Sequence, residues 1–331
     1  MKLNELKERM EKNELFLSIC AHYLNNYERL VTPEMIDEIT NNDRSYDQRA
    51  FVSFISAAFI DDEILEKEME REYFSHSIKK LSPEKYKNDP YFKNIKITDK
   101  KIGSWTLSHQ KYAPYEAFVR DDYTLFDDFR EVCNIGFFDE EFSYPTVFEN
   151  GVEWMAIKPN EIETMKEPIE KAHGDIVVFG LGLGYYAYMT SLKENVRSIT
   201  VIERDENVIK LFSENILPHF GNGEKITIIK SDAFSYAEGE MKNKSFDFAF
   251  VDLWRDISDG TELYIKMKKL EQYHKNTEFA YWIERSILIS IRKNIFYAIL
   301  KSIDQKKNTL TEKEIFERLE LNYIKEFVKY L

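Results

Sequence analysis

The most constraining feature of this chain is a short apolar run that opens into three closely spaced glycines. Residues 175–186 read D-I-V-V-F-G-L-G-L-G-Y-Y, with Gly180, Gly182 and Gly184 at alternate positions. A second apolar run ends on the acid Glu203. A strand that leads into a glycine turn and a helix, followed by a strand with an acid at its tip, is typical of doubly wound sheets that bind a nucleoside. Glycines suit this turn because a Cβ would collide with a closely approaching ligand.

The spacing of the glycines excludes two common nucleotide-binding motifs. A dinucleotide fingerprint, G-x-G-x-x-G, requires a glycine at position 185, where this chain has Tyr185. A phosphate-binding P-loop requires Lys followed by Ser or Thr after the glycines, and no such pair is present. The remaining pattern is G-x-G-x-G, and we expect an adenosine-bearing ligand other than NAD.

Two later segments continue this pattern in order. Residues 225–234 contain an apolar run that is followed by Asp232 and Ala233. Residues 245–254 contain another, which is followed by Asp252. With the glycines and Glu203, these segments resemble the class I S-adenosylmethionine-dependent methyltransferases. The resemblance implies an α/β fold with a Rossmann-like doubly wound sheet and S-adenosylmethionine as the cofactor.

The resemblance also implies a role for each of these residues. The three glycines would hold the methionine end of the cofactor, and Glu203 would accept hydrogen bonds from its ribose hydroxyls. Asp232 and Ala233 would contact the adenine, and Asp232 also suits the N-cap of the helix that follows. Asp252 is the candidate catalytic residue, because an acid at the carboxyl end of a parallel strand faces the ligand crevice. Its role, base or acceptor orientation, stays open.

Departures from the family pattern keep two alternatives open. Many members have an acid two residues before the first glycine, where this chain has Val178. Spermidine synthases also lack that acid, so a spermidine-synthase-like aminopropyltransferase is one alternative. Their glycine loop, however, has an acid and an extra glycine where this chain has Leu183 and Tyr185. A non-catalytic scaffold that binds S-adenosylmethionine is the other alternative, and Asp252 argues against it.

The segment after Asp252 narrows the methyl acceptor. It reads D-L-W-R-D and lacks the prolines that methyltransferases acting on exocyclic base amines carry there. The net charge of −13 also disfavours a phosphate backbone as partner. We therefore expect a small-molecule or protein acceptor and no nucleic acid. Tyr185 and Trp254 are candidate pocket walls, and both suit ordinary packing equally well.

Three regions follow one another along the chain. Residues 1–100 show apolar residues at helical spacing, and residues 101–158 alternate aromatic or β-branched residues with polar ones, which predicts a small antiparallel β-layer. Residues 159–331 contain the glycine loop and end in a helical tail that replaces the family's last two strands. A helix from Pro159, capped by Asn160, precedes the first strand, and its Asn160, Glu161 and Thr164 are secondary site candidates.

Composition adds limits on the class of protein. The two cysteines are far apart in the sequence and no Cys/His spacing suits zinc, so we expect no metal site and no disulfide framework. The first residues are charged rather than typical of a signal peptide, and the longest apolar stretch, 51–60, is too short to span a bilayer. These features predict a cytoplasmic protein.

Overall fold

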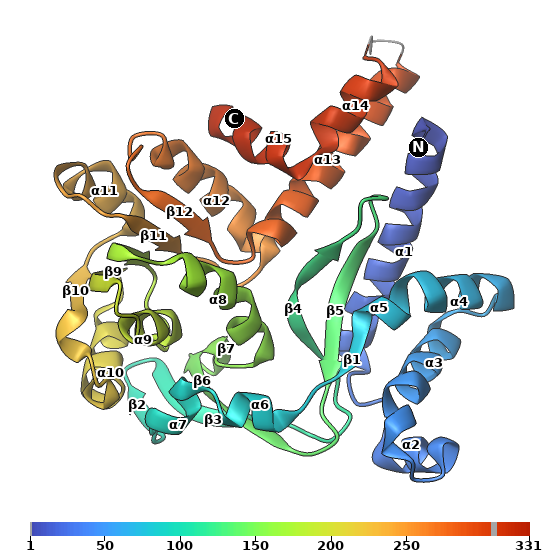
Figure 1. The fold of residues 1–331 in the computed structure, drawn as a ribbon, viewed down its shortest axis with the longest axis horizontal. Helices are drawn as coiled ribbons and strands as arrows, with labels where there is room; N and C mark the ends of the chain where they lie inside the picture. The colour runs from blue at the N-terminus through green and yellow to red at the C-terminus, as the bar shows by residue number, and fades with distance from the viewer. Residues whose placement is uncertain (1, 306–309) are drawn as a thin grey trace. The chain divides into compact units, whose positions relative to one another are not determined.

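The computed structural model describes residues 2–305 and 310–331, and these form two compact units. The first unit contains residues up to 89, 109–144 and 158–163, and the second contains the remaining segments. The elements of each unit are labelled in Figure 1.

Each unit combines segments that are separated in the chain. The chain crosses from one unit to the other within three elements, each of which begins in one unit and ends in the other. These elements are β3 (Trp105–Tyr112), β6 (Phe142–Glu149) and α8 (Pro159–Lys171).

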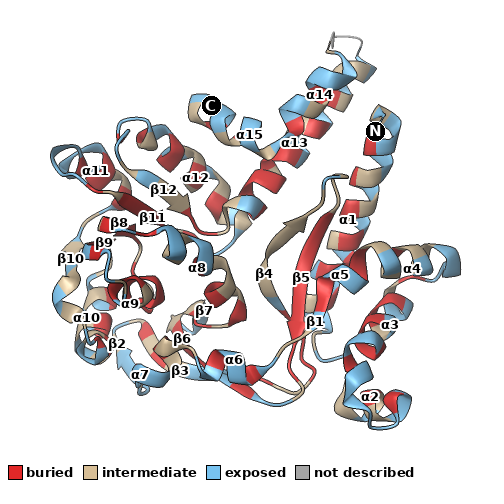
Figure 2. Cartoon of the chain, in the orientation of Figure 1, coloured by how far each residue is buried: buried red, intermediate tan, exposed pale blue. Residues whose placement is uncertain are grey.

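The first unit has a small sheet with the strand order β1-β5-β4. β1 (Ile78–Lys80) runs parallel to β5 (Glu131–Phe137), which pairs antiparallel with β4 (Phe118–Leu125). β5 is buried along its whole length (Figure 2). β1 lies in the region predicted to be helical. The sequence did not indicate this strand, because three residues are too few to show alternation of apolar and polar side chains.

Helices provide most of the remaining core of the first unit. The largest is α1, whose side chains Phe16, Ile19 and Tyr23 are buried at helical spacing. The N-cap of α2 is Thr32, whose hydroxyl accepts a hydrogen bond from Met35 N, and Pro33 follows at the first helical position. The helices of this unit are α1 (Leu3–Asn26), α2 (Pro33–Thr40), η1 (Arg44–Tyr46), α3 (Asp47–Phe59), α4 (Glu63–Met69), η2 (Glu70–Phe74), α5 (Ser75–Ser77) and α6 (Pro83–Lys87).

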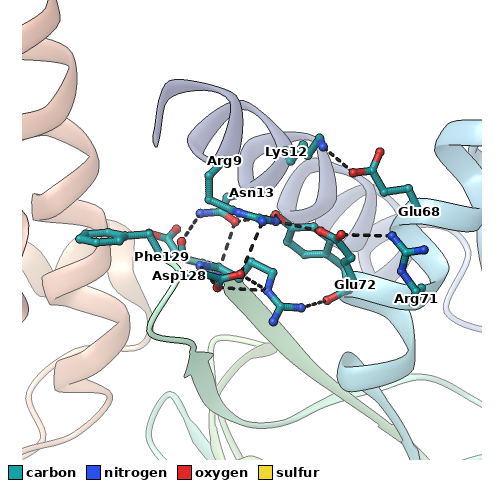
Figure 3. A network of polar contacts seen from close by, with 11 residues as sticks. Arg9, Lys12, Asn13, Glu68, Arg71, Glu72, Asp128 and Phe129 are labelled. Atoms are coloured by element: carbon teal, nitrogen blue, oxygen red, sulfur yellow. Dashed lines mark hydrogen bonds and ion pairs between the residues drawn. The ribbon is translucent and has the colours of Figure 1, made fainter. Parts of the chain in front are cut away.

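A polar network fixes the turn between β4 and β5 to α1. Asn13 donates to Phe129 O at 2.8 Å and accepts from the Tyr73 hydroxyl at 3.0 Å, while Arg9 pairs with Glu72 at 2.9 Å. Figure 3 shows Arg9 and Asn13 directed at the turn that carries Asp128 and Phe129. Phe129 has a φ of 64°, which few residues other than glycine adopt. The hydrogen bond from Asn13 holds its carbonyl in place.

The second unit is built on a parallel sheet with the strand order β10-β9-β8-β11-β12. The order reverses direction between β8 and β11, which makes the sheet doubly wound and confirms the predicted fold class. Val177 pairs with Thr200 of β9 on one side and with Ala249 of β11 on the other. The strands are β8 (Gly174–Phe179), β9 (Val196–Glu203), β10 (Ile226–Lys230), β11 (Phe248–Val251) and β12 (Glu278–Tyr281).

Helices pack on this sheet through aromatic side chains. Tyr186 of α9 stacks on Phe250 of β11 with ring centroids 4.0 Å apart, and Tyr264 of α12 packs edge-on against Tyr281 of β12 at 5.0 Å. β11 is buried at every residue, as a central parallel strand covered on both faces should be. The helices between the strands are α9 (Tyr185–Ser191), α10 (Glu206–Asn215), η3 (Leu217–His219), η4 (Gly223–Lys225), α11 (Ala233–Glu238), η5 (Glu240–Asn243) and α12 (Ile257–Glu271).

The strands of residues 101–158 fall in two sheets: β4 and β5 belong to the small sheet of the first unit, and a further sheet has the order β2-β3-β6-β7. β2 (Lys100–Ile102) pairs antiparallel with β3, and β6 pairs antiparallel with β7 (Val152–Ala156). The second unit also contains the short helix α7 (Pro90–Asn94).

The chain ends in helices, as predicted, and strand β12 forms the edge of the main sheet. Glu284, at the start of the tail, accepts from the Tyr264 hydroxyl of α12 at 2.8 Å and pairs with Lys325, later in the tail, at 2.7 Å. Thr311 and Glu314 form a capping box. The tail helices are α13 (Glu284–Asp304), α14 (Glu312–Leu319), α15 (Leu321–Phe327) and η6 (Val328–Tyr330). None of the helices in residues 2–305 and 310–331 is both long and apolar enough to cross a membrane.

Candidate functional site

Gly180 joins the end of β8 to the end of β11. Its φ is 100°, and a Cβ on it would collide with the backbone carbonyl of Asp252. Its N–H donates to Ile202 O at 3.0 Å, while Asp252 N donates to Phe179 O at 2.9 Å. The glycine therefore allows the carboxyl ends of β8, β9 and β11 to meet closely, and it sets Asp252 at that meeting point.

The other two loop glycines also have positive φ angles, 50° at Gly182 and 72° at Gly184. A Cβ on Gly182 would collide with the sulfur of Met155, and one on Gly184 would collide with the ring of Phe212. Protein atoms thus fill the directions in which side chains would project. Backbone conformation and packing already require glycine at these positions, and the cofactor contact predicted for them stays a prediction.

Glu203 connects the glycine loop to the start of α10. One carboxylate oxygen accepts from Leu181 N at 3.3 Å, and the other accepts from Asp205 N at 2.8 Å. A carboxylate has about four acceptor positions, so roughly two remain for other donors. The side chain is half-buried at the carboxyl end of β9, where the predicted ribose contact would require it.

Asp232 caps α11, as the sequence predicted. Its carboxylate accepts from Ser235 N at 2.9 Å, and this bond to a backbone amide lowers its pKa. Ala233, the first residue of α11, is buried, whereas Asp232 is exposed just after β10. The cap explains the carboxylate without a ligand, and the predicted adenine contact stays a prediction.

Asp252 follows the last residue of β11 and differs from the other acids at this edge of the sheet. Its carboxylate is half-buried, and within the part of the chain that the structure describes it makes no hydrogen bond or ion pair. Removal from water raises the pKa of Asp252 to about 7. A strongly perturbed acid at the carboxyl edge of a parallel sheet is a candidate catalytic group.

The two predicted wall residues are both packed. Tyr185 is 2% exposed and lies 5.6 Å from the ring of Tyr91. Trp254 is 5% exposed and lies against α12, where a Cβ on Gly260 would approach its ring to 2.9 Å. The buried indole N–H of Trp254 has no hydrogen-bond partner among the described residues. Packing accounts for both aromatic rings, as the sequence allowed.

The helix before the first strand differs from its prediction. α8 begins at Pro159, so Asn160 occupies the second helical position instead of the N-cap. Asn160 and Glu161 belong to the first unit, and their predicted site role stays a prediction. Thr164 belongs to the second unit, where its hydroxyl accepts from the indole N–H of Trp282 at 2.9 Å. Trp282 follows β12, and its backbone N–H donates to the carbonyl oxygen of Val251, the residue before Asp252.

The structure adds two residues that the sequence did not indicate. Met155 of β7 places its sulfur 3.3 Å from Leu183 N, on the glycine loop. Ile283, in the turn between β12 and α13, has a φ of 46°, and a β-branched residue rarely adopts this conformation outside strained sites. No local pattern identifies either residue, because both act through contacts or conformations fixed by the fold. Within residues 2–305 and 310–331, His, Cys, Asp and Glu do not gather in groups of three that could hold a metal ion.

Comparison with known proteins gives matches among solved structures only. No family model matches the chain, and no curated protein matches it. A structure described as an O-methyltransferase, from Klebsiella pneumoniae, is 19% identical over 29% of this chain and 43% of its own, with a TM-score of 0.23. The spermidine synthase from Thermotoga maritima is 13% identical over 41% of this chain and 49% of its own, with a TM-score of 0.30.

A third match is a spermidine synthase in complex with the transition state analogue AdoDATO. It is 14% identical over 41% of this chain and 50% of its own, with a TM-score of 0.33. The chain thus spans half or less of the length of these structures. The strand order, the glycine turn and the acids at the strand ends carry the assignment: the second unit is a Rossmann-like domain with a doubly wound sheet.

Proposed function

We propose that this protein is an S-adenosylmethionine-dependent methyltransferase that acts on a small-molecule or protein acceptor. The observation that carries the proposal is the state of Asp252. Its carboxylate has no partner in the described residues, and its backbone is held against Gly180 at the carboxyl edge of the sheet. A carboxylate with no structural bond in a desolvated position costs stability, and such costs are common at functional sites.

The chemistry of methyl transfer uses a group of this kind. The acceptor atom forms a bond to the methyl carbon while the sulfur–methyl bond breaks, and its electron pair returns to sulfur to give S-adenosylhomocysteine. The acceptor loses a proton, and Asp252 is the candidate to receive or orient it. A base whose pKa is about 7 is suited to proton transfer near neutral pH.

The remaining residues of the edge would hold the cofactor. The glycine loop would take the methionine end, and the free acceptor positions of Glu203 would take the ribose hydroxyls. Asp232 and Ala233, just after β10, would lie beside the adenine. No metal is part of the proposal.

One structural observation favours methyl transfer over aminopropyl transfer. Spermidine synthases resemble this chain but use paired acids after the fourth strand, and here the second acid of that segment is Asp256. Asp256 accepts from Ser258 N at 2.7 Å as the N-cap of α12. This cap gives Asp256 a structural role. Asp252 is then the acid of this segment whose carboxylate has no structural role among the described residues.

Calorimetric titration tests the proposal with four ligands: S-adenosylmethionine, S-adenosylhomocysteine, decarboxylated S-adenosylmethionine and NAD. We expect S-adenosylmethionine and S-adenosylhomocysteine to bind more tightly than decarboxylated S-adenosylmethionine and NAD. A clear preference for the decarboxylated ligand, with thioadenosine release in the presence of a diamine, would replace the proposal by aminopropyl transfer. Tighter binding of NAD would end both.

A further inference from the structure

The strand β7 contacts both segments that frame the proposed cofactor site. Met155 lies on the glycine loop, with its sulfur 3.3 Å from Leu183 N and in the space that a Cβ on Gly182 would need. The preceding residue, Trp154, lies under the guanidinium of Arg255, whose Cζ is 5.8 Å from the ring centroid. Arg255 belongs to the segment that follows Asp252.

A β-bulge explains how two consecutive side chains reach neighbouring segments. Val147 of β6 pairs with Met155, and the next residue, Phe148, pairs with Glu153, so Trp154 is the extra residue on β7. A regular strand sends consecutive side chains to opposite faces, whereas a bulge re-aims them locally. Bulges of this kind are frequent next to active sites.

The contact of Met155 concerns the part of the loop that a methionine-bearing cofactor needs. The thioether accepts the N–H of Leu183, which a carboxylate or other polar group of the ligand would otherwise use. Thioether sulfur is a weak acceptor and Met is a flexible side chain, so both the bond and the rotamer are readily exchanged. Met155 is half-buried and packs on the loop through its side chain alone.

We infer that Met155 is a gate of the glycine loop: it occupies the subsite of the cofactor's amino-acid arm and must leave when that arm binds. The inference rests on the proposed function, because it assigns a competitor for one part of the proposed ligand. Adenosine and 5′-methylthioadenosine lack the amino-acid arm and bind without displacing Met155. S-Adenosylmethionine and S-adenosylhomocysteine bind only to the fraction of molecules in which Met155 has moved.

The test compares three substitutions at one position. Met155→Ala removes every side-chain atom beyond Cβ and Met155→Val removes those beyond the Cγ position, and Val also suits a strand. Met155→Leu keeps comparable bulk on the loop and serves as the matched control. Affinities for S-adenosylhomocysteine and 5′-methylthioadenosine are measured by calorimetry, and thermal unfolding confirms that each variant is folded.

We expect Met155→Ala and Met155→Val to bind S-adenosylhomocysteine about tenfold more tightly than the original protein, with affinity for 5′-methylthioadenosine unchanged within about twofold. Met155→Leu should stay within about threefold of the original for both ligands. An unchanged or reduced ratio of the two affinities in the truncated variants would overturn the gate while leaving the proposed function intact. Failure of every adenosyl ligand to bind the original protein and the truncated variants would instead overturn the proposed function.

Discussion

The two ends of strand β11 each carry an aspartate, and the two carboxylates are in opposite states. At the amino end, Asp247 accepts from Asp175 N at 2.8 Å and from Arg197 at 2.6 Å. The bond from Asp175 N, supported by Arg197, holds the pKa of Asp247 below its usual range. At the carboxyl end, Asp252 has no such partner in the described residues, and desolvation raises its pKa to about 7.

The two ends of this strand therefore differ in whether the protein itself bonds the carboxylate. The amino edge satisfies its charges internally: Arg197 also pairs with Asp175 at 2.6 Å, and Ser198 donates to the same carboxylate. At the carboxyl edge, Glu203 bonds to the glycine loop and Asp232 caps a helix, whereas the Asp252 carboxylate makes no bond to any residue that the structure describes. Ligands of doubly wound sheets bind at the carboxyl edge. Substitutions at the two ends should therefore act on different properties.

The largest expected effect is on ligand binding through Glu203. Glu203→Ala should weaken S-adenosylmethionine binding by about 1.5–3 kcal/mol, the usual range for hydrogen bonds to a charged group. A 2′,3′-dideoxy analogue should lose less, since it lacks the ribose hydroxyls but still depends on the loop that Glu203 holds through Leu181 N. Calorimetry with both ligands measures the difference. Equal losses would assign the residue to the loop alone, and Asp247→Asn at the opposite edge should alter neither affinity.

The next effect is on stability, and its sign is unusual. The folded-state pKa of Asp252 is above its unfolded value, so its contribution to stability is present below about pH 4 and is lost as pH rises through about 7. Asp252→Asn removes that loss and should stabilise the protein at pH 8 by on the order of 2 kcal/mol, allowing for partial solvent screening. The gain should disappear at pH 4. Unfolding by urea at the two pH values gives the comparison, and destabilisation at pH 8 would show that the carboxylate makes a bond in the folded protein.

A smaller effect of opposite sign is expected at Asp247. Its pKa is lowered in the folded protein, so its contribution to stability is present above the unfolded pKa and is lost as pH falls through the folded value. Asp247→Asn should destabilise the protein at neutral pH by at most about 1 kcal/mol, because the pair with Arg197 is largely solvent-exposed. The same urea series measures it. A loss that persists unchanged at pH 2 would point to geometry instead of charge.

The sequence predicted the framework of this contrast and not its details. The glycine turn, the acids at the strand ends and the helical tail were predicted, because each depends on local pattern or chain order. The local pattern could not show that Gly182 faces Met155, that Asp256 caps a helix beginning at Ile257, or that the Asp252 carboxylate has no partner in residues 2–305 and 310–331. These facts depend on contacts between segments far apart in the chain. The three-residue strand β1 escaped prediction because its pairing with β5 is equally distant.

The central claim, that Asp252 is kept free to face the cofactor, predicts proton release on binding. At pH 7 about half of the Asp252 carboxyl groups carry a proton, since the pKa is about 7. The positive sulfonium of S-adenosylmethionine would lower that pKa, so binding should release up to roughly half a proton. S-Adenosylhomocysteine has no sulfonium charge and should release less.

Calorimetric titration of both ligands at pH 7, in two buffers with different ionisation enthalpies, measures this release directly. The account predicts that S-adenosylmethionine releases more protons than S-adenosylhomocysteine in the original protein, and that the difference is lost in Asp252→Asn. An identical difference in the original protein and in Asp252→Asn would contradict it, because the proton would then come from another group and Asp252 would not face the site.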